Sequence, residues 1–172
     1  MTKLIDILNN SDHSEIFRQA GKIGDSMNIP VYLVGGYIRD VILQRERTDI
    51  DIMVEKDVFE FSKNLAKKLN VNTTINFEKF STSRIPYNLC DIEIANARVE
   101  SYASNSRKPI NIKPTTITKD LERRDFTINA IGVSLSPDNF GELVDPYNGI
   151  KDINKGIIKT PLDPDKTFID DP

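Results

Sequence analysis

The chain has 172 residues, 38% hydrophobic and 28% charged, which is ordinary for one globular domain with a core of its own. The net charge of −3 is not that of a strongly basic nucleic-acid-binding domain, and the single cysteine and histidine exclude an internal disulfide and a zinc finger. No apolar run approaches about 18 residues and no signal sequence is visible, so we expect a cytoplasmic protein without a membrane partner.

An amphipathic helix is predicted first, over residues 11–27, with Ser11 or Asp12 as its N-cap and Pro30 as a stop. A β-branched strand follows at residues 31–34. We interpret the helix as a packing element, because its apolar face has the period of a core-facing helix.

A glycine turn follows this strand. Gly35 and Gly36 have no Cβ, so a backbone or a ligand can approach closely, and residues 37–43 then show the pattern of a short helix. Free amides at a helix N-terminus attract anions, phosphate above all. Arg39 in the first turn opposes the usual preference for acidic residues there, and a bound anion would explain its presence.

Two aspartates, Asp49 and Asp51, complete this stretch. In a strand, residues i and i+2 point to the same face, about 6.6 Å apart along the chain. Two carboxylates converging at roughly 4 Å repel by about 4 kcal/mol at an effective dielectric of 20, a cost that a divalent cation removes. The pattern therefore favours a metal site.

The middle of the chain is predicted to contain one helix, at residues 56–69, and strands at residues 71–80, 83–87 and 89–97. In the last of these, Asp91 and Glu93 share one face. A third carboxylate beside the aspartate pair would complete a metal site, whereas the two acidic residues taken alone are more often a solvated face.

Residues 98–114 lack periodicity and are predicted to form a long loop, a type that tends to be functional or disordered. Between residues 101 and 126, six basic residues stand against three acidic ones, so positive charge is concentrated there. We predict a charged helical turn at residues 123–125, a strand at 131–135, and a short helix at 149–154 followed by a strand.

In combination, these segments resemble the class II tRNA nucleotidyltransferases, or CCA-adding enzymes, and the bacterial poly(A) polymerases that share their head domain. Singly, a glycine pair is usually a turn and a charged triplet is usually solvated, so the resemblance depends on joint occurrence in the family's order. It covers roughly residues 31–172. The matching segments are LVGGYIRD, TDIDIMV, IEIANARVESY, RKP, DLERRDFTINAI and LVDPYNGIKDI.

The resemblance implies an α/β (α+β) fold of the polymerase-β-like nucleotidyltransferase type, with a mixed, mostly antiparallel sheet of about five strands and flanking helices. Residues 1–160 would form the head domain, and residues 161–172 would begin the connection to a helical neck. The family's neck motif for base selection has no match here, and we expect the chain to be a cut piece of a longer protein.

The implied activity is metal-dependent addition of CMP and AMP, from CTP and ATP, to the 3′ end of tRNA. Asp49 and Asp51 would hold Mg²⁺, and Glu93 would be the third catalytic carboxylate. The residues implied to contact the nucleotide are Gly35, Gly36, Arg39, Asp40, Arg107, Arg123, Arg124, Asp125 and Asn129.

Several alternatives stay open. A bacterial poly(A) polymerase and a CC-adding or A-adding specialist share this chemistry. A catalytically silent nucleotide-binding or RNA-binding module belongs to another class, and the intact carboxylates speak against it, because such a module has no reason to bear their repulsion. The sequence gives no oligomeric state.

Overall fold

The computed structural model describes residues 2–46, 49–88, 90–102 and 109–170. The helices are α1 (Thr2–Asn9), α2 (Ser14–Met27), α3 (Gly36–Ile42), α4 (Val58–Lys68), α5 (Ile117–Glu122), α6 (Gly149–Lys155) and α7 (Pro164–Asp170). The strands are β1 (Val31–Val34), β2 (Ile50–Val54), β3 (Ile75–Phe77), β4 (Thr82–Tyr87), β5 (Cys90–Asn96), β6 (Arg98–Tyr102), β7 (Pro109–Pro114), β8 (Gly132–Ser134) and β9 (Leu143–Val144). Short 3₁₀ turns are η1 (Glu78–Phe80), η2 (Thr127–Asn129) and η3 (Pro137–Asn139).

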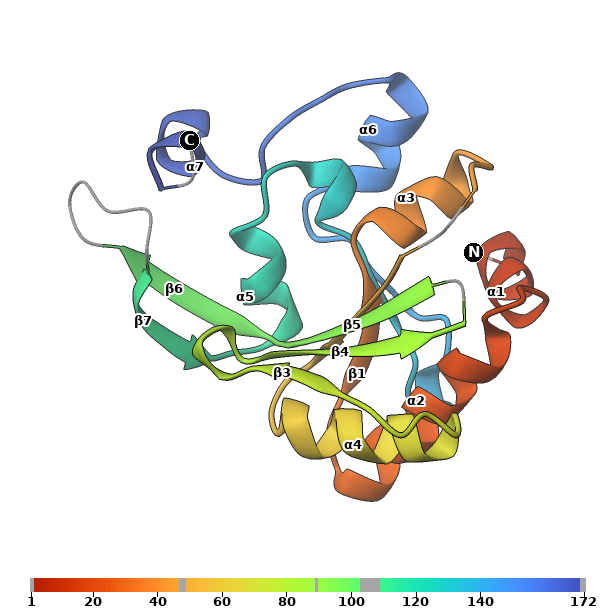
Figure 1. Cartoon of the computed structure of the whole chain (residues 1–172). Coiled ribbons are helices and arrows are strands. Elements are labelled where there is room, and N and C mark those ends of the chain that lie inside the picture. Colours follow the sequence, from red (N-terminus) through yellow and green to blue (C-terminus); the bar gives the residue numbers. More distant parts are fainter. Residues whose placement is uncertain (1, 47–48, 89, 103–108, 171–172) are drawn as a thin grey trace.

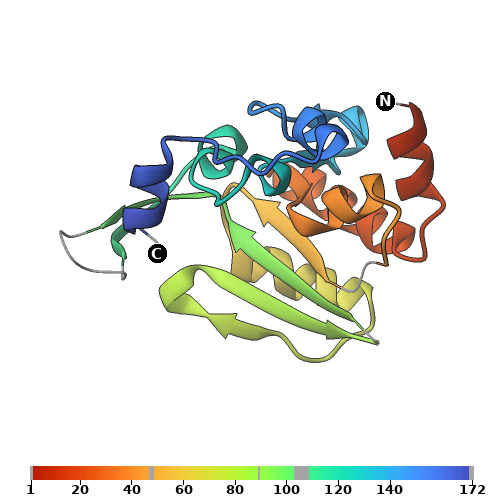
Figure 2. The same ribbon diagram turned by 90° about the horizontal axis from the view of Figure 1, so that it is seen from above.

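A seven-stranded sheet in the order β3-β4-β5-β2-β1-β8-β9 forms the centre of the fold, and β6 and β7 form a separate two-stranded sheet. In the large sheet, β2 and β5 are parallel to each other, and the other described neighbours are antiparallel. The β6–β7 ribbon projects to one side, with α7 beside it (Figures 1 and 2). The parallel pair matters because it aligns two acidic residues.

Alternating side chains give the large sheet one covered face and one more open face. Ile50, Ile52 and Val54 of β2 are buried in the main core, which includes the apolar sides of α2 and α4. These two helices lie together against the sheet in Figure 1. Met53 belongs instead to a smaller apolar cluster with α5, and Asp51 shares its face. The open face is therefore where polar groups of the strands can meet a ligand.

Close packing of α2 on the sheet gives a first testable prediction. A Cβ on Gly21 would overlap the backbone carbonyl oxygen of Leu135. Gly-to-Ala substitution in an exposed helix normally stabilises by about 1 kcal/mol, but here we expect Gly21→Ala to destabilise by about 2 kcal/mol because the helix must move away from the strand. Thermal unfolding should show Tm lowered by about 5 °C.

Its matched control is Lys22→Ala, at the next position on the exposed side of α2. This change should leave Tm within about 1 °C of the parent value, since exposed substitutions rarely change stability by more than about 0.5 kcal/mol. A Gly21→Ala variant as stable as Lys22→Ala would show that the helix is not in tight contact with the sheet.

The prediction of a mixed, mostly antiparallel sheet with flanking helices is confirmed, and the large sheet has seven strands where about five were expected. The edge strands of the sheet are short: β3 has three exposed residues, and β9, which was not predicted, has two residues, too few for alternation to be visible in sequence. The strand predicted over residues 71–80 is reduced to β3, followed by the turn η1.

Three other local predictions need correction. The predicted loop at residues 98–114 contains β6 and β7, which pair with each other despite their irregular polarity pattern. The charged triplet at 123–125 follows α5 instead of forming a helical turn. The strand predicted after residue 154 is irregular at residues 157–160. Across the described part of the chain, helices are too short or too polar to span a bilayer.

Candidate active site

Two carboxylates lie side by side on the open face of the sheet. Asp51 in β2 is aligned with Glu93 in the parallel strand β5. Asp49 immediately precedes β2 and is exposed. Burial raises the pKa of Asp51, the negative charges of Glu93 and Asp49 raise it further, and Arg124 opposes the shift. The fold therefore gathers the three predicted carboxylates within electrostatic reach of one another and disfavours the ionised form of the most buried one.

Glu93 is held by an arginine that the sequence analysis did not single out. Arg84 lies opposite Glu93 in the antiparallel β4–β5 pair. Its guanidinium forms ion pairs with Glu93 (Nε to Oε1, 3.5 Å) and with Asp91 (Nη1 to Oδ2, 3.4 Å). The three side chains are 39% to 56% exposed, and such pairs contribute roughly 0 to 1 kcal/mol. Glu93 is thus held weakly and can turn toward another cation.

Gly35 provides the closest approach between the glycine turn and the carboxylates. Its φ of +72° lies in the left-handed region. A Cβ at this position would lie 2.9 Å from Nη1 of Arg124 and 3.4 Å from Oδ2 of Asp51. The guanidinium of Arg124 is thereby brought to the carboxylate of Asp51 across a residue that has no side chain. Any larger residue would push the two groups apart.

Four of the predicted nucleotide-binding residues form one hydrogen-bond network. Arg39 donates from Nε and Nη2 to the two carboxylate oxygens of Asp40, both at 2.9 Å, and from Nη1 to Oδ1 of Asn129 at 2.8 Å. Asn129 in turn donates from Nδ2 to Asp125 at 3.1 Å. The hydrogen bond to Asp40 raises the pKa of Arg39 further. The network fixes the Arg39 guanidinium next to Gly36, whose missing Cβ would lie 3.4 Å from Nη2.

The turn η2, which carries Asn129, is anchored by contacts with α6 and with the chain that follows α6. Thr127 donates its hydroxyl to Oδ2 of Asp152 in α6 at 2.7 Å, and both residues are buried. The amide of Thr127 also donates to the carbonyl of Lys159 at 2.7 Å. Both contacts fix the first residue of η2, two positions before Asn129, and so help to place Asn129 beside Arg39.

Asp120 in α5 is a site residue that sequence reasoning missed. Its side chain has no solvent exposure. Oδ1 accepts hydrogen bonds from the backbone amide of Arg98 at 3.1 Å and from Nε and Nη2 of Arg123 at 3.1 and 2.9 Å. Oδ2 lies 3.6 Å from Nε of Arg124. The sequence did contain a signal for this contact. Asp120 precedes Arg123 by three residues and Arg124 by four, and helical residues at these spacings lie on the same side.

Arg124 is the more buried of the two arginines that Asp120 holds. Its side chain is 22% exposed, and burial lowers the pKa of its guanidinium while Asp120 opposes this effect. Nη1 makes a long contact of 3.4 Å to the carbonyl of Asn129. An arginine held by its Nε side, with its outer nitrogens toward the carboxylates, is suited to bind an anion between them.

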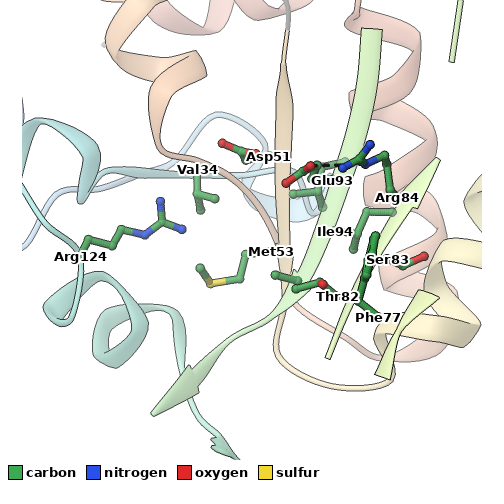
Figure 3. Close-up of a pocket in the computed structure, with 12 residues that line it drawn as sticks. Val34, Asp51, Met53, Phe77, Thr82, Ser83, Arg84, Glu93, Ile94 and Arg124 are labelled. Atoms are coloured by element: carbon green, nitrogen blue, oxygen red, sulfur yellow. Dashed lines mark ion pairs between the residues drawn. The ribbon is translucent and has the colours of Figure 1, made fainter. Parts of the chain in front are cut away.

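A pocket of about 310 Å³ connects these groups across the open face. Figure 3 shows Arg124 on one side of Asp51 and Arg84, paired with Glu93, on the other. Val34 and Met53 lie between them. Arg107, a predicted nucleotide-binding residue, lies outside the described residues.

The donor set fits a hard divalent cation that a substrate helps to hold. In the described ranges of the chain, no group of three His, Cys, Asp or Glu side chains is placed to form a complete metal cage. Mg²⁺ in phosphoryl-transfer sites is usually bound by one or two carboxylates together with substrate phosphates and water. Asp49 and Asp51 are the residues that would supply oxygen ligands of this kind, and Arg124 next to Asp51 has the chemistry to bind a phosphate.

Comparison with protein families agrees with this geometry. The family described as Poly A polymerase head domain matches residues 31–159. The chain belongs to this family. The family match includes Asp49, Asp51 and Glu93 as well as the Arg39 and Asp120 networks.

Among curated proteins, the head domain is 35% identical over 173 residues to an A-adding tRNA nucleotidyltransferase of Halalkalibacterium halodurans. The alignment covers 98% of this chain and 40% of the relative. The chain thus spans well under half the length of the relative it matches.

Solved structures give the same assignment. A Thermotoga maritima CCA-adding enzyme complexed with tRNA is 36% identical, with a TM-score of 0.82 over 99% of this chain and 37% of that one. A CCA-adding enzyme in complex with CTP is 38% identical, also with a TM-score of 0.82, over 99% of this chain and 38% of that one. The head domain therefore has the fold of nucleotidyltransferases, as the sequence resemblance implied.

Proposed function

We propose that this head domain transfers nucleoside monophosphates from CTP and ATP to the 3′ end of tRNA, with Mg²⁺ bound at Asp49 and Asp51. The observation that carries the proposal is the placement of Asp51 beside Glu93, with Arg124 facing Asp51 across Gly35. Relatives solved in complex with tRNA and with CTP, which are 36% and 38% identical to this chain over the aligned region, support it.

Each part of the site has a role in this proposal. Arg124 and Arg39 bind the triphosphate, and Arg39 is held ready by Asp40 and Asn129. Asp125 and Arg123 are positioned next to these groups and contact the sugar or the phosphates. Glu93 accepts the proton of the attacking 3′-hydroxyl or orients that hydroxyl. A bound Mg²⁺ would neutralise the charge that develops on the phosphate oxygens.

An A-adding specialist is the second candidate, because the curated relative that covers 98% of this chain carries that name. CC addition and poly(A) synthesis use the same head chemistry. The choice among them depends on how bases and RNA are selected, for which the described residues provide no base-pairing motif that we can assign.

The test uses the complete gene product with labelled CTP or ATP, magnesium and three RNAs: tRNA without its CCA end, tRNA lacking only the final adenosine, and an unrelated RNA. Two cytidines followed by one adenosine, on tRNA only, would establish CCA addition. A single adenosine on the second RNA alone would establish an A-adding enzyme, and long adenosine runs on every RNA a poly(A) polymerase. No incorporation on any primer would favour the binding module.

Gly35→Ala should reduce transfer about 100-fold. The new methyl group would lie 2.9 Å from Nη1 of Arg124 and would move that guanidinium away from Asp51. Loss of a donor that stabilises charge in the transition state typically lowers the rate by roughly 10²-fold or more. Steady-state incorporation rates with tRNA and CTP or ATP measure the effect.

The matched control is Gly156→Ala. Gly156 also has a positive φ, +64°, but a Cβ there would meet no atom within 4 Å. Gly156→Ala should lose about 1 kcal/mol because its backbone is left-handed. Gly35→Ala should lose more, because φ +72° with ψ −136° is a conformation that only glycine adopts readily, and of the two only Gly35→Ala should lose activity. Equal activities would show that the space at Gly35 is not needed for transfer.

A further inference from the structure

The open face of the sheet continues past Glu93 onto β4 and β3. Arg84 in β4 and Phe77 at the end of β3 both line the pocket that contains Asp51 and Glu93. The guanidinium carbon of Arg84 lies 6.0 Å from the centroid of the Phe77 ring. Figure 3 shows both residues on the side of Glu93 away from Arg124. The pocket therefore has an aromatic ring together with a cation on the Glu93 side, and the cation Arg124 on the other side.

The order of the strands indicates which substrate approaches the carboxylates from this side. Gly35 follows β1, and Arg124 approaches it, so the proposed triphosphate position lies at the β1 side of Asp51. In an in-line displacement, the attacking hydroxyl and the leaving pyrophosphate are on opposite sides of the phosphorus. The hydroxyl must therefore arrive from the β5–β4–β3 side, where Arg84 and Phe77 lie.

Both side chains have the chemistry that the end of an RNA strand requires. The ring of Phe77 is 41% exposed on the edge strand of the sheet, and nucleic-acid bases stack on exposed aromatic rings with little sequence preference. Arg84 has weak, solvent-exposed ion pairs with Glu93 and Asp91, which a phosphate oxygen can replace without loss.

We propose that Phe77 and Arg84 form the subsite for the 3′-terminal nucleoside of the RNA that is extended. The terminal base stacks on Phe77, and Arg84 leaves Glu93 to bind the phosphate on the 5′ side of that nucleoside. Glu93, relieved of its partner, then turns to the 3′-hydroxyl beside Asp51. Arg84 is a positioning residue in this scheme, because it couples the arrival of the RNA end to the release of Glu93. The inference rests on the proposed function and assigns the RNA side of the same site.

Steady-state kinetics of the complete gene product separate the two substrates. For Phe77→Leu and Arg84→Gln, the KM for tRNA lacking its final adenosine should rise about tenfold or more, the usual loss for one stacked base. The KM for ATP at saturating RNA should stay within about twofold of the parent value. Phe77→Tyr, which keeps the ring, should restore the RNA KM.

Lys79→Gln is the matched control for charge. Lys79 is an exposed cation in the adjoining turn η1 and does not line the pocket. It tests whether the effect of Arg84→Gln is general attraction of RNA, and its RNA KM should change by less than about twofold.

A binding measurement makes the inference independent of turnover. An RNA with 2-aminopurine as its 3′-terminal base should lose fluorescence on binding the parent protein, because stacking quenches it, and should lose much less with Phe77→Leu. Unchanged quenching and RNA KM in an active Phe77→Leu variant would overturn the subsite alone. A raised ATP KM with an unchanged RNA KM would also overturn it, by assigning the ring to the incoming nucleotide. Ring-dependent quenching without any transfer by the parent protein would retain the subsite and reject the transferase proposal.

Discussion

Asp51→Asn is expected to lower nucleotide incorporation by at least about 10³-fold, because it removes one of the two proposed Mg²⁺ ligands and the charge next to Arg124. The amide has nearly the same shape as the carboxylate, so the change tests charge and not packing. Incorporation of labelled ATP or CTP by the complete gene product measures it.

The same substitution should not destabilise the metal-free protein. Burial raises the pKa of Asp51 above its unfolded value, so its ionised form disfavours folding at neutral pH, and this penalty disappears as the pH falls below the unfolded pKa. Asn has no such penalty, so Tm at neutral pH without magnesium should be equal or higher. Added Mg²⁺ with nucleotide should raise Tm in the parent protein and not in the variant.

Asp25→Asn is the control for a loss of negative charge as such. Asp25 is exposed on α2, on the covered side of the sheet away from the pocket. Its activity should remain within about twofold of the parent value, since distant exposed charges are screened by salt. Near-normal transfer by Asp51→Asn would refute the assignment of the metal ligands.

Asp120→Ala is expected to cause the largest loss of stability among simple substitutions near the site. The side chain is fully buried and holds Arg123 and Arg124 as well as the backbone amide of Arg98. Removing one partner of a buried ion pair costs about 3 to 5 kcal/mol, because the remaining charge is left without compensation. Thermal unfolding should show Tm lowered on the order of 10 °C.

Glu122→Ala on the same helix is its matched control. Glu122 pairs with Lys119 at 2.9 Å, but the side chains are 32% and 61% exposed. Exposed ion pairs contribute little to stability because solvent screens them, so Tm should fall by no more than about 2 °C. Similar losses for the two variants would mean that the Asp120 cluster is not a supporting element of the site.

The sequence was sufficient for those features that follow from local pattern. Alternation in residues 89–97 predicted that Glu93 and Asp91 share a face, and the structure has Ile92 and Ile94 buried on the other. The helix periods at residues 11–27 and 56–69 correspond to α2 and α4. Such periodic patterns predict structure correctly because each strand or helix buries one of its sides in the core.

Features that depend on long-range pairing could not be derived in this way. The contact of Arg84 with Glu93 requires the β4–β5 register, which no local pattern specifies. The role of Asp120 depends on a helix that meets the chain at Arg98, twenty-two residues earlier. The catalytic, metal-binding and nucleotide-binding roles of all the predicted site residues stay predictions: Asp49, Asp51, Glu93, Gly35, Gly36, Arg39, Asp40, Arg107, Arg123, Arg124, Asp125 and Asn129.

The separation of the site's components along the chain has a consequence for how the protein folds. Arg39 reaches its partner Asn129 across 90 residues, and β1 gains its second neighbour only when β8 pairs Val133 with Leu33. Contacts between distant segments form slowly, because a long loop must close before they contribute. During synthesis, a ribosome-bound chain that already contains Asp51 still lacks Arg124 and exposes one edge of β1. Such an unpaired edge is prone to aggregate, so interruptions of translation before residue 134 should yield insoluble fragments rather than partly active ones.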